Sequence, residues 1–154
     1  MPHALNLTLP IKQDAETQER LKQIASTFAT TLQPKIERAL RLSRIVHFAR
    51  VLVIDGRYLQ VITEYDGDHR EYTEFFRKEL PDVFGELFSL AEGAPSKEAM
   101  SDPDAFFKFS SGLQVRSLGE SANGMTGQDG QTEGYLFSAY GDREVKEILP
   151  KLTP

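Results

Sequence analysis

The strongest feature of the hydrophobic pattern is a pair of apolar runs joined by Asp55-Gly56. The first run spans residues 45–54 and is rich in β-branched side chains, and the second spans residues 58–65. Asp-Gly between two such runs is the strongest short-range hairpin signal, because both residues tolerate the positive φ angles of a tight turn. The pattern therefore predicts two antiparallel strands.

Alternation and helical spacing predict the other elements. Residues 4–11 alternate apolar and polar side chains up to Pro10, as a half-buried strand does. Residues 135–140 predict a fourth strand, and the Gly-rich residues 119–134 before it predict a flexible loop. Helices are expected where apolar residues recur every three or four positions after an acidic cap. The four caps are Asp14, Asp68, Asp102 and Asp142, and prolines interrupt the first two helices at Pro34 and Pro81.

This order of elements predicts one α+β domain over residues 1–154. Apart from a short helix near residue 102 and a C-terminal helix, it matches the ferredoxin-like βαββαβ unit. In that unit the helices cover one face of a four-stranded antiparallel sheet and leave the other face open.

The open face needs a cover, because residues 45–54 carry apolar side chains on both sides of their strand. A second copy of the chain, packed sheet against sheet, would supply it and make a homodimer, which is the arrangement we favour. The alternative is that the terminal helix, Asp142 to Leu152, folds back over the sheet. Both arrangements require that this strand does not lie along solvent.

Composition narrows the classes of function. The formal net charge is -5 and the pI about 5.2, which argues against nucleic acid or an anionic membrane as partner, because both select clustered Lys and Arg. The absence of Cys excludes disulfides, thiolate metal sites and Cys nucleophiles. No apolar run reaches the roughly 20 residues of a membrane helix, and residues 1–5 lack a signal-peptide pattern. We therefore expect a cytoplasmic protein.

Three short segments carry a resemblance. Residues 47–50 read His-Phe-Ala-Arg, residues 64–68 read Glu-Tyr-Asp-Gly-Asp, and residues 137–140 read Phe-Ser-Ala-Tyr. Together they resemble a group of bacterial proteins with an HFAR…YDG(D/S)…YSAY pattern, although Phe137 stands in place of Tyr and Gly141 in place of Pro. That group is similar to dimeric α/β-barrel proteins, a superfamily with haem-binding and haem-degrading proteins, dye-decolorising peroxidases and cofactor-free monooxygenases. The resemblance implies a fold and a dimer but no particular activity.

His47 and Arg50 are the first candidate site residues. They are three apart on a strand, so alternation places them on opposite faces. A two-residue turn would set His47 opposite Glu64, whereas a three-residue turn would set Phe48 there and bring Arg50 near diagonally. His47 is either a general base or haem ligand, or a hydrogen-bonded structural residue. Arg50 is either a clamp for a carboxylate or propionate, or half of an ion pair with Glu64 or Asp66.

Glu64, Tyr65 and Tyr140 are the further candidate ligand-binding residues, and they lie toward strand ends. The run from Tyr65 to Asp68 holds two carboxylates that could bind a cation, or Asp68 caps a helix while Asp66 makes a turn. Tyr140 either hydrogen-bonds a ligand or packs with a wet hydroxyl. With only three histidines and no zinc spacing, the chain predicts no metal site unless subunits share one. The aromatic residues line an apolar cavity or simply pack the core: Phe75, Phe76, Phe84, Phe88, Phe106, Phe107 and Phe109.

Three functions fit these observations. The first is a small-molecule-binding or accessory protein with a pocket at the sheet, favoured because no catalytic motif is present and taking a small apolar or aromatic ligand. The second is a dimeric-barrel enzyme that acts on haem or an aromatic substrate through His47 or Arg50. The third is a non-catalytic structural dimer.

Overall fold

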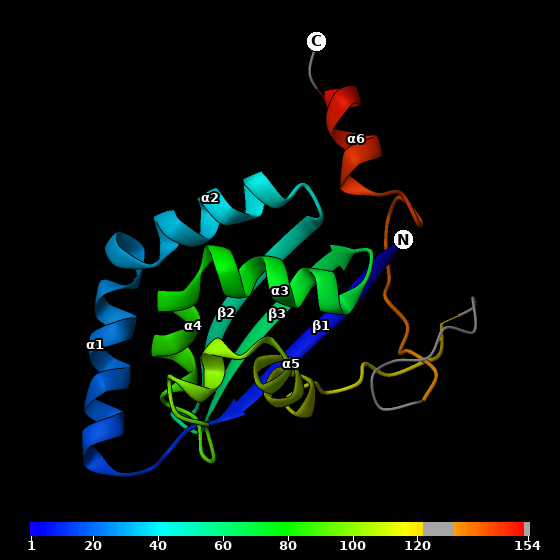
Figure 1. Cartoon of the computed structure of the whole chain (residues 1–154). Coiled ribbons are helices and arrows are strands. Elements are labelled where there is room, and N and C mark those ends of the chain that lie inside the picture. Colours follow the sequence, from blue (N-terminus) through cyan, green and yellow to red (C-terminus); the bar gives the residue numbers. More distant parts are fainter. Residues whose placement is uncertain (122–130, 153–154) are drawn as a thin grey trace.

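The computed structural model describes residues 1–121 and 131–152 and has an α+β fold (Figure 1). The strands are β1 (Pro2–Pro10), β2 (Val46–Ile54) and β3 (Tyr58–Asp66). The helices are α1 (Ala15–Thr31), α2 (Gln33–Ser43), α3 (His69–Glu79), α4 (Pro81–Phe88), the 3-10 turn η1 (Ala99–Ser101), α5 (Pro103–Gly112) and α6 (Val145–Leu152). None of the described helices combines the length and the apolarity needed to cross a bilayer.

The predicted helix boundaries at acidic caps and prolines largely agree with the structure. The carboxylate of Asp14 accepts the backbone N–H of Thr17 and opens α1, and Asp68 and Asp102 cap α3 and α5 in the same way. Pro34 separates α2 from α1. These caps stabilise the helices because each satisfies a backbone donor that the first turn leaves unpaired.

The sheet is antiparallel with the order β1-β3-β2. The predicted hairpin is confirmed, and Ile54 pairs with Tyr58, so the turn has three residues, 55–57. Asp55 and Gly56 take positive φ angles of 53° and 63°, as the Asp-Gly signal requires. This turn length sets Phe48 opposite Glu64, which is the second of the two predicted registers.

The predicted fourth strand at residues 135–140 is wrong. Those residues pair with no strand, because the outer edge of β1 is already occupied. The Thr8 N–H donates to the Leu113 carbonyl at 2.9 Å, and the Val115 N–H donates to the Asn6 carbonyl at 2.9 Å. The short segment 113–115 thus takes the place that we predicted for residues 135–140.

A side chain extends this edge pairing. The amide oxygen of Gln114 accepts the Asn6 N–H at 2.7 Å, and its nitrogen donates to the Ala4 carbonyl at 3.1 Å. Backbone groups along the first half of β1 are therefore satisfied without a full strand beside it.

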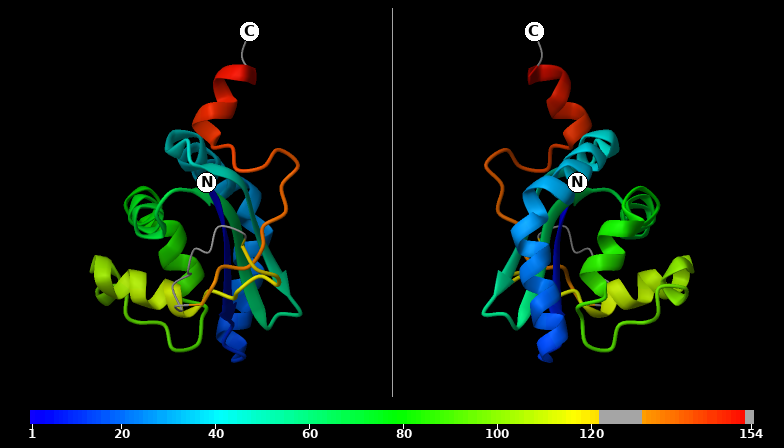
Figure 2. Two further views of the ribbon diagram at one scale, coloured as in Figure 1. Left: turned by 90° about the vertical axis from the view of Figure 1, so that its right-hand side faces the viewer. Right: turned by 90° about the vertical axis from the view of Figure 1, so that its left-hand side faces the viewer.

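The core lies between the sheet and the helices: α3, α4 and α5 lie on one side of the sheet (Figure 2), and α1 and α2 add Leu21 and Ala39. Every second residue of β1 and β3 is buried, as the alternation in the sequence predicted. The predicted aromatic set contributes to this core or packs against it: Phe75, Phe76, Phe84, Phe88, Phe106 and Phe109. Ring contacts join α4 to α5, and the remaining predicted ring, Phe107 of α5, contacts His69 of α3, so the set behaves as packing.

The other sheet face carries no helix. Figure 2 shows residues 131–144 running along that side, and Figure 1 shows α6 extending away from the sheet. The alternative in which the terminal helix covers the sheet is therefore wrong, and no described residue of α6 is buried. Phe48 is 68% exposed, and Ile54 and Tyr58 are also exposed. Within a single chain, β2 thus lies along solvent on this face, against our expectation that both its faces are covered.

Candidate functional site

A hydrogen-bonded network lies at the end of the sheet where β2 begins and β3 ends. The Asp66 Oδ1 lies 2.8 Å from the His47 Nε2, and the His47 Nδ1 lies 2.7 Å from the Tyr140 hydroxyl. The side chains of His47 and Asp66 are only 4% and 2% exposed. The three residues therefore form a carboxylate–imidazole–phenol relay whose inner half is shielded from water.

A bulge in β2 makes this arrangement. The pairing with β3 shifts between Val46 and Phe48, which leaves His47 as the extra residue of the strand. A bulge re-aims a side chain that simple alternation would place elsewhere. His47 consequently meets Asp66, and the expectation that His47 and Arg50 must face opposite sides of the sheet is wrong.

The protons of the relay can be assigned from its chemistry. An ionised carboxylate only accepts hydrogen bonds, so the His47 Nε2 carries the hydrogen and its Nδ1 accepts from the Tyr140 hydroxyl. Partial burial, followed by the negative charges of Asp66 and Glu64, raises the pKa of Tyr140. Tyr140 is thus a hydrogen-bond donor, able to act as a general acid but not as a phenolate nucleophile at neutral pH.

The second carboxylate oxygen of Asp66 binds the C-terminal segment. Its Oδ2 accepts the backbone N–H of Val145 at 2.8 Å, and Val145 is the first residue of α6. The predicted cap Asp142 is therefore wrong: α6 begins three residues later, and a strand residue satisfies its first donor. Through Tyr140 and Val145, Asp66 ties the segment after residue 138 to the sheet.

Most of the predicted site residues lie near this network. Arg50 and Glu64 share the open sheet face, because Arg50 pairs with Ile62 and Glu64 with Phe48. Burial raises the pKa of Glu64, while the positive charges of Arg50 and His47 oppose that rise. Tyr65 points the other way, into the core, and burial raises its pKa strongly.

Around Tyr65 lies a second cluster that sequence reasoning missed. The Tyr65 hydroxyl lies 3.0 Å from the His69 Nδ1, and the Thr73 hydroxyl lies 3.2 Å from the His69 Nε2. Because the Thr73 hydroxyl donates to the His69 carbonyl, it must accept from Nε2, so Nδ1 accepts from Tyr65. Burial lowers the pKa of His69 to about 4, against a smaller raising effect of Asp68 and with a further lowering by His3.

His3 forms a partly buried hydrogen-bonded contact with a residue far away in the sequence. Its Nδ1 lies 3.0 and 3.1 Å from the two carboxylate oxygens of Glu133, a residue 130 positions away. His3 lies on β1 and is 8% exposed. No periodicity or spacing connects the two residues, so only the folded chain reveals the pair.

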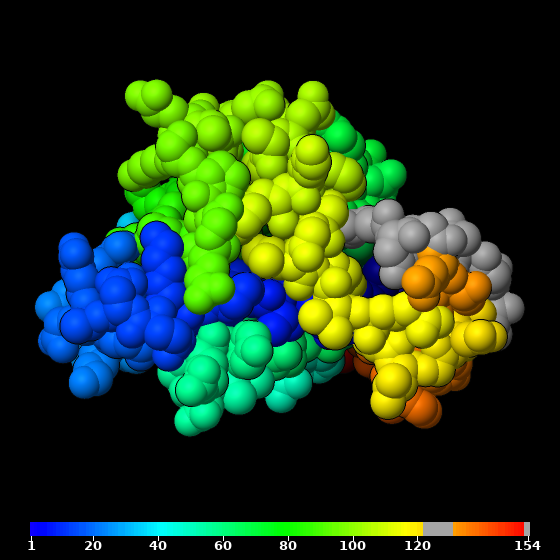
Figure 3. All heavy atoms as spheres, turned by 90° about the horizontal axis from the view of Figure 1, so that it is seen from below, coloured from blue at the N-terminus to red at the C-terminus, as the bar shows by residue number. Residues whose placement is uncertain are grey.

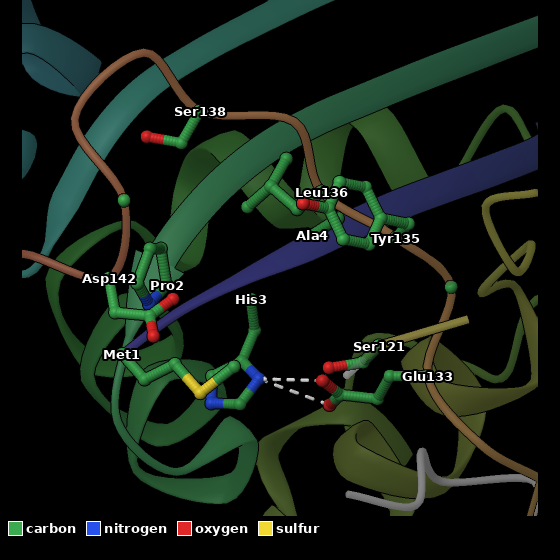
Figure 4. Close-up of a pocket in the computed structure, with 12 residues that line it drawn as sticks. Met1, Pro2, His3, Ala4, Ser121, Glu133, Tyr135, Leu136, Ser138 and Asp142 are labelled. Atoms are coloured by element: carbon green, nitrogen blue, oxygen red, sulfur yellow. Dashed lines mark hydrogen bonds and ion pairs between the residues drawn. The ribbon is translucent and has the colours of Figure 1, made fainter. Parts of the chain in front are cut away.

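A cavity of about 420 Å³ lies beside this pair, between the start of β1 and residues 133–142 (Figure 4). Its lining consists of Met1, Pro2, His3, Ala4, Ser121, Glu133, Gly134, Tyr135, Leu136, Ser138, Gly141 and Asp142. None of the predicted candidates, His47, Arg50, Glu64, Tyr65 or Tyr140, belongs to that lining.

The outer wall of the cavity is held by backbone contacts. Segments 117–121 and 131–135 lie side by side (Figure 3), and the Ser121 N–H donates to the Glu133 carbonyl at 2.8 Å. A β-carbon at Gly134 would overlap the carbonyl of Ser117, so the close approach requires glycine there. Part of the predicted Gly-rich loop, residues 122–130, lies outside the described residues.

Two observations bear on cofactors. Among residues 1–121 and 131–152, no group of three or more His, Asp or Glu side chains is arranged to hold a metal ion. Both ring nitrogens of His47 are engaged, so ligation of haem iron by His47 would require loss of the bond to Asp66 or to Tyr140.

Comparison with known proteins identifies no relative. No family model, no curated protein and no solved structure matches the chain.

Proposed function

We propose that this chain is a small-molecule-binding protein whose ligand occupies the cavity between β1 and residues 133–142. The observation that carries the proposal is the cavity itself, about 420 Å³ with the His3–Glu133 pair in its wall. Ligand sites commonly measure about 300–1,000 Å³ and combine apolar walls with a few fixed polar groups. Pro2, Leu136 and Tyr135 supply the apolar part.

The walls support a largely preformed site. One wall is β1, which pairs along its whole length with β3. The other wall is held at Gly134 against Ser117 and at Tyr140 and Val145 by the Asp66 network. Binding to preorganised walls loses less conformational entropy than binding that must order a loop.

The test is to fill the cavity. Ala4 lines it from β1, and Ala4→Phe should occupy much of its volume. Ligand-observed NMR with small aromatic fragments of cationic, anionic and neutral charge should detect binding to the wild-type chain and little or none to Ala4→Phe. Thr8→Phe, on the same strand and face but outside the lining, is the matched control and should bind as the wild type does. Binding that survives Ala4→Phe, or that is absent from the wild type, would refute the proposal.

The enzyme alternative, with haem or an aromatic substrate acted on through His47 or Arg50, has less support. Neither residue lines the cavity, and the imidazole of His47 is committed to Asp66 and Tyr140. A binding role uses the cavity without requiring either residue to be released.

We also propose a cytoplasmic location for this chain, which the absence of Cys suits.

The same chain is proposed to be a ferredoxin-like homodimer of the dimeric α/β-barrel kind. With segment 113–115 beside β1, the order across the sheet becomes 113–115, β1, β3, β2. Each helical connection then joins two parallel strands with an antiparallel strand between them, which is the split βαβ arrangement.

The exposed face supports the choice of a second copy as its cover. Phe48, Ile54 and Tyr58 make it apolar, and Arg50 and Glu64 add one charge of each sign. A two-fold axis through this face could place Arg50 of one protomer near Glu64 of its partner, since an isologous interface must be self-complementary.

Light scattering after size-exclusion chromatography tests the dimer. The wild-type chain, of 17.3 kDa, should elute with twice that mass. Phe48→Glu should reduce the mass to that of one chain, because a charge in the centre of the interface would be desolvated without a partner. Leu42→Glu is the control, since Leu42 is 59% exposed on α2 and the open sheet face carries no helix. A wild-type chain that stays monomeric at micromolar concentration would count against this arrangement.

A further inference from the structure

We propose that the cavity takes a small organic cation, an amine that carries a short apolar or aromatic group. This inference rests on the proposed function and specifies the class of ligand. Its basis is the charge of the lining: Glu133 and Asp142 contribute carboxylates, and the described lining residues include no Lys or Arg.

Glu133 retains capacity to accept a further donor. Its two oxygens offer about four lone-pair positions, and the contact with the His3 Nδ1 uses one hydrogen. The buried imidazole fixes where the carboxylate points, and Figure 4 shows Ser121 beside it. An ammonium group has three donors and no acceptor, so it complements a carboxylate and a hydroxyl.

The remaining lining suits an apolar body. In Figure 4, Tyr135 and Leu136 lie on the far side of the cavity from Glu133, with Ala4 beside them. A ligand with one charged end and one apolar end could therefore satisfy both sides at once. The ring of Tyr135 adds a face that favours cations over anions.

One lining residue, Met1, carries a positive charge on its α-amino group, and a carboxylate outside the lining pairs with it. The α-amino group of Met1 lies 3.2 Å from the carboxylate of Glu144, which is outside the lining. Glu144 therefore offsets this positive charge from outside the cavity. An anionic ligand would meet two like charges in a partly desolvated space, where Coulomb interactions are stronger than in water.

Three ligands of nearly equal size test the inference at neutral pH: benzylamine, benzyl alcohol and benzoate. NMR titration of the wild-type chain should show that benzylamine binds at least about tenfold more tightly than either of the other ligands. The reason is that a hydrogen bond to a charged group is stronger than one between neutral groups. Glu133→Gln should lower the benzylamine affinity about tenfold and leave benzyl alcohol unchanged. Asp142→Asn should likewise lower the affinity for benzylamine and leave that for benzyl alcohol unchanged. Because this variant leaves the contact between His3 and Glu133 intact, it tests the inference even if Glu133→Gln misfolds.

The outcomes separate the two proposals. Equal or tighter binding of benzyl alcohol or benzoate, or benzylamine binding that ignores both substitutions, would overturn the cation inference. If those ligands still lose affinity in Ala4→Phe, the cavity remains a binding site. If none of the three binds the wild-type chain in a way that Ala4→Phe abolishes, both the ligand class and the proposed function fail.

Discussion

Replacing Asp66 by alanine should lower the free energy of unfolding by about 3 kcal/mol, because it leaves a buried imidazole N–H and a partly buried backbone N–H without an acceptor. The donors are the His47 Nε2–H and the Val145 N–H, each 2.8 Å from a carboxylate oxygen. Urea denaturation at neutral pH measures the loss. Hydrogen exchange should also become faster from residue 140 to 152, since Tyr140 and Val145 lose their attachment to the sheet.

Asp68→Ala is the matched control for this loss. Asp68 lies two residues further along and caps α3 through the backbone N–H groups of Arg70 and Glu71. Removing an exposed cap of this kind costs about 1 kcal/mol. If Asp66→Ala proved no more destabilising than Asp68→Ala, or left exchange in α6 unchanged, the network would not anchor the C-terminal segment.

The Asp66 network and the cavity share one segment. Residues 133–142 form the outer wall of the cavity, and Tyr140 joins that wall to His47. Asp66→Ala should therefore weaken ligand binding as well as stability, although Asp66 does not line the cavity. The relay acts here as a support of the site.

Lowering the pH should destabilise the chain through His69. Burial lowers its folded-state pKa to about 4, whereas its unfolded value is 6.5. Between these values the unfolded chain binds more protons, so the contribution is complete above pH 6.5 and falls as the pH drops toward 4. From about pH 7.5 to about pH 4.5 the cost attributable to His69 should reach about 2.5 kcal/mol.

His69→Gln isolates the contribution of His69 to this pH dependence of stability. Glutamine keeps a donor and an acceptor for Thr73 and Tyr65 but does not titrate. Urea titrations of both proteins at several pH values give the difference between their free energies of unfolding. The contributions of the carboxylates, which both proteins share, cancel in that difference. As the pH falls from about 7.5 to about 4.5, the free energy of unfolding of His69→Gln should rise by about 2.5 kcal/mol relative to that of the wild type. A difference that stays constant with pH would show that His69 is not buried in its neutral form.

Local chemistry could be predicted from the sequence with good accuracy. The hairpin followed from Asp55-Gly56, and the caps at Asp14, Asp68 and Asp102 followed from residue type and position. In each case the stabilising contact joins residues only a few positions apart. The physical cause is therefore present in a short stretch of chain.

The errors concern contacts between distant segments. Residues 135–140 have the composition of a strand, but a strand also needs a free edge, and residues 113–115 with the Gln114 side chain already occupy that of β1. Asp142 has the chemistry of a cap, yet Asp66 reaches the first donor of α6 instead. The bulge at His47 reversed the expected direction of a side chain.

The alternation and spacing of apolar residues were sufficient to specify the α+β class, the hairpin with its two registers, and most helix starts, since these depend on interactions within a few residues. Which register formed, which edge was filled and where His3 met Glu133 depended on competition among segments up to 130 positions apart. Such competition is resolved by packing and by the satisfaction of every buried donor, which exist only when the whole chain is folded. For that reason two of the candidate residues joined a relay, while the cavity arose from residues with no signal in the sequence.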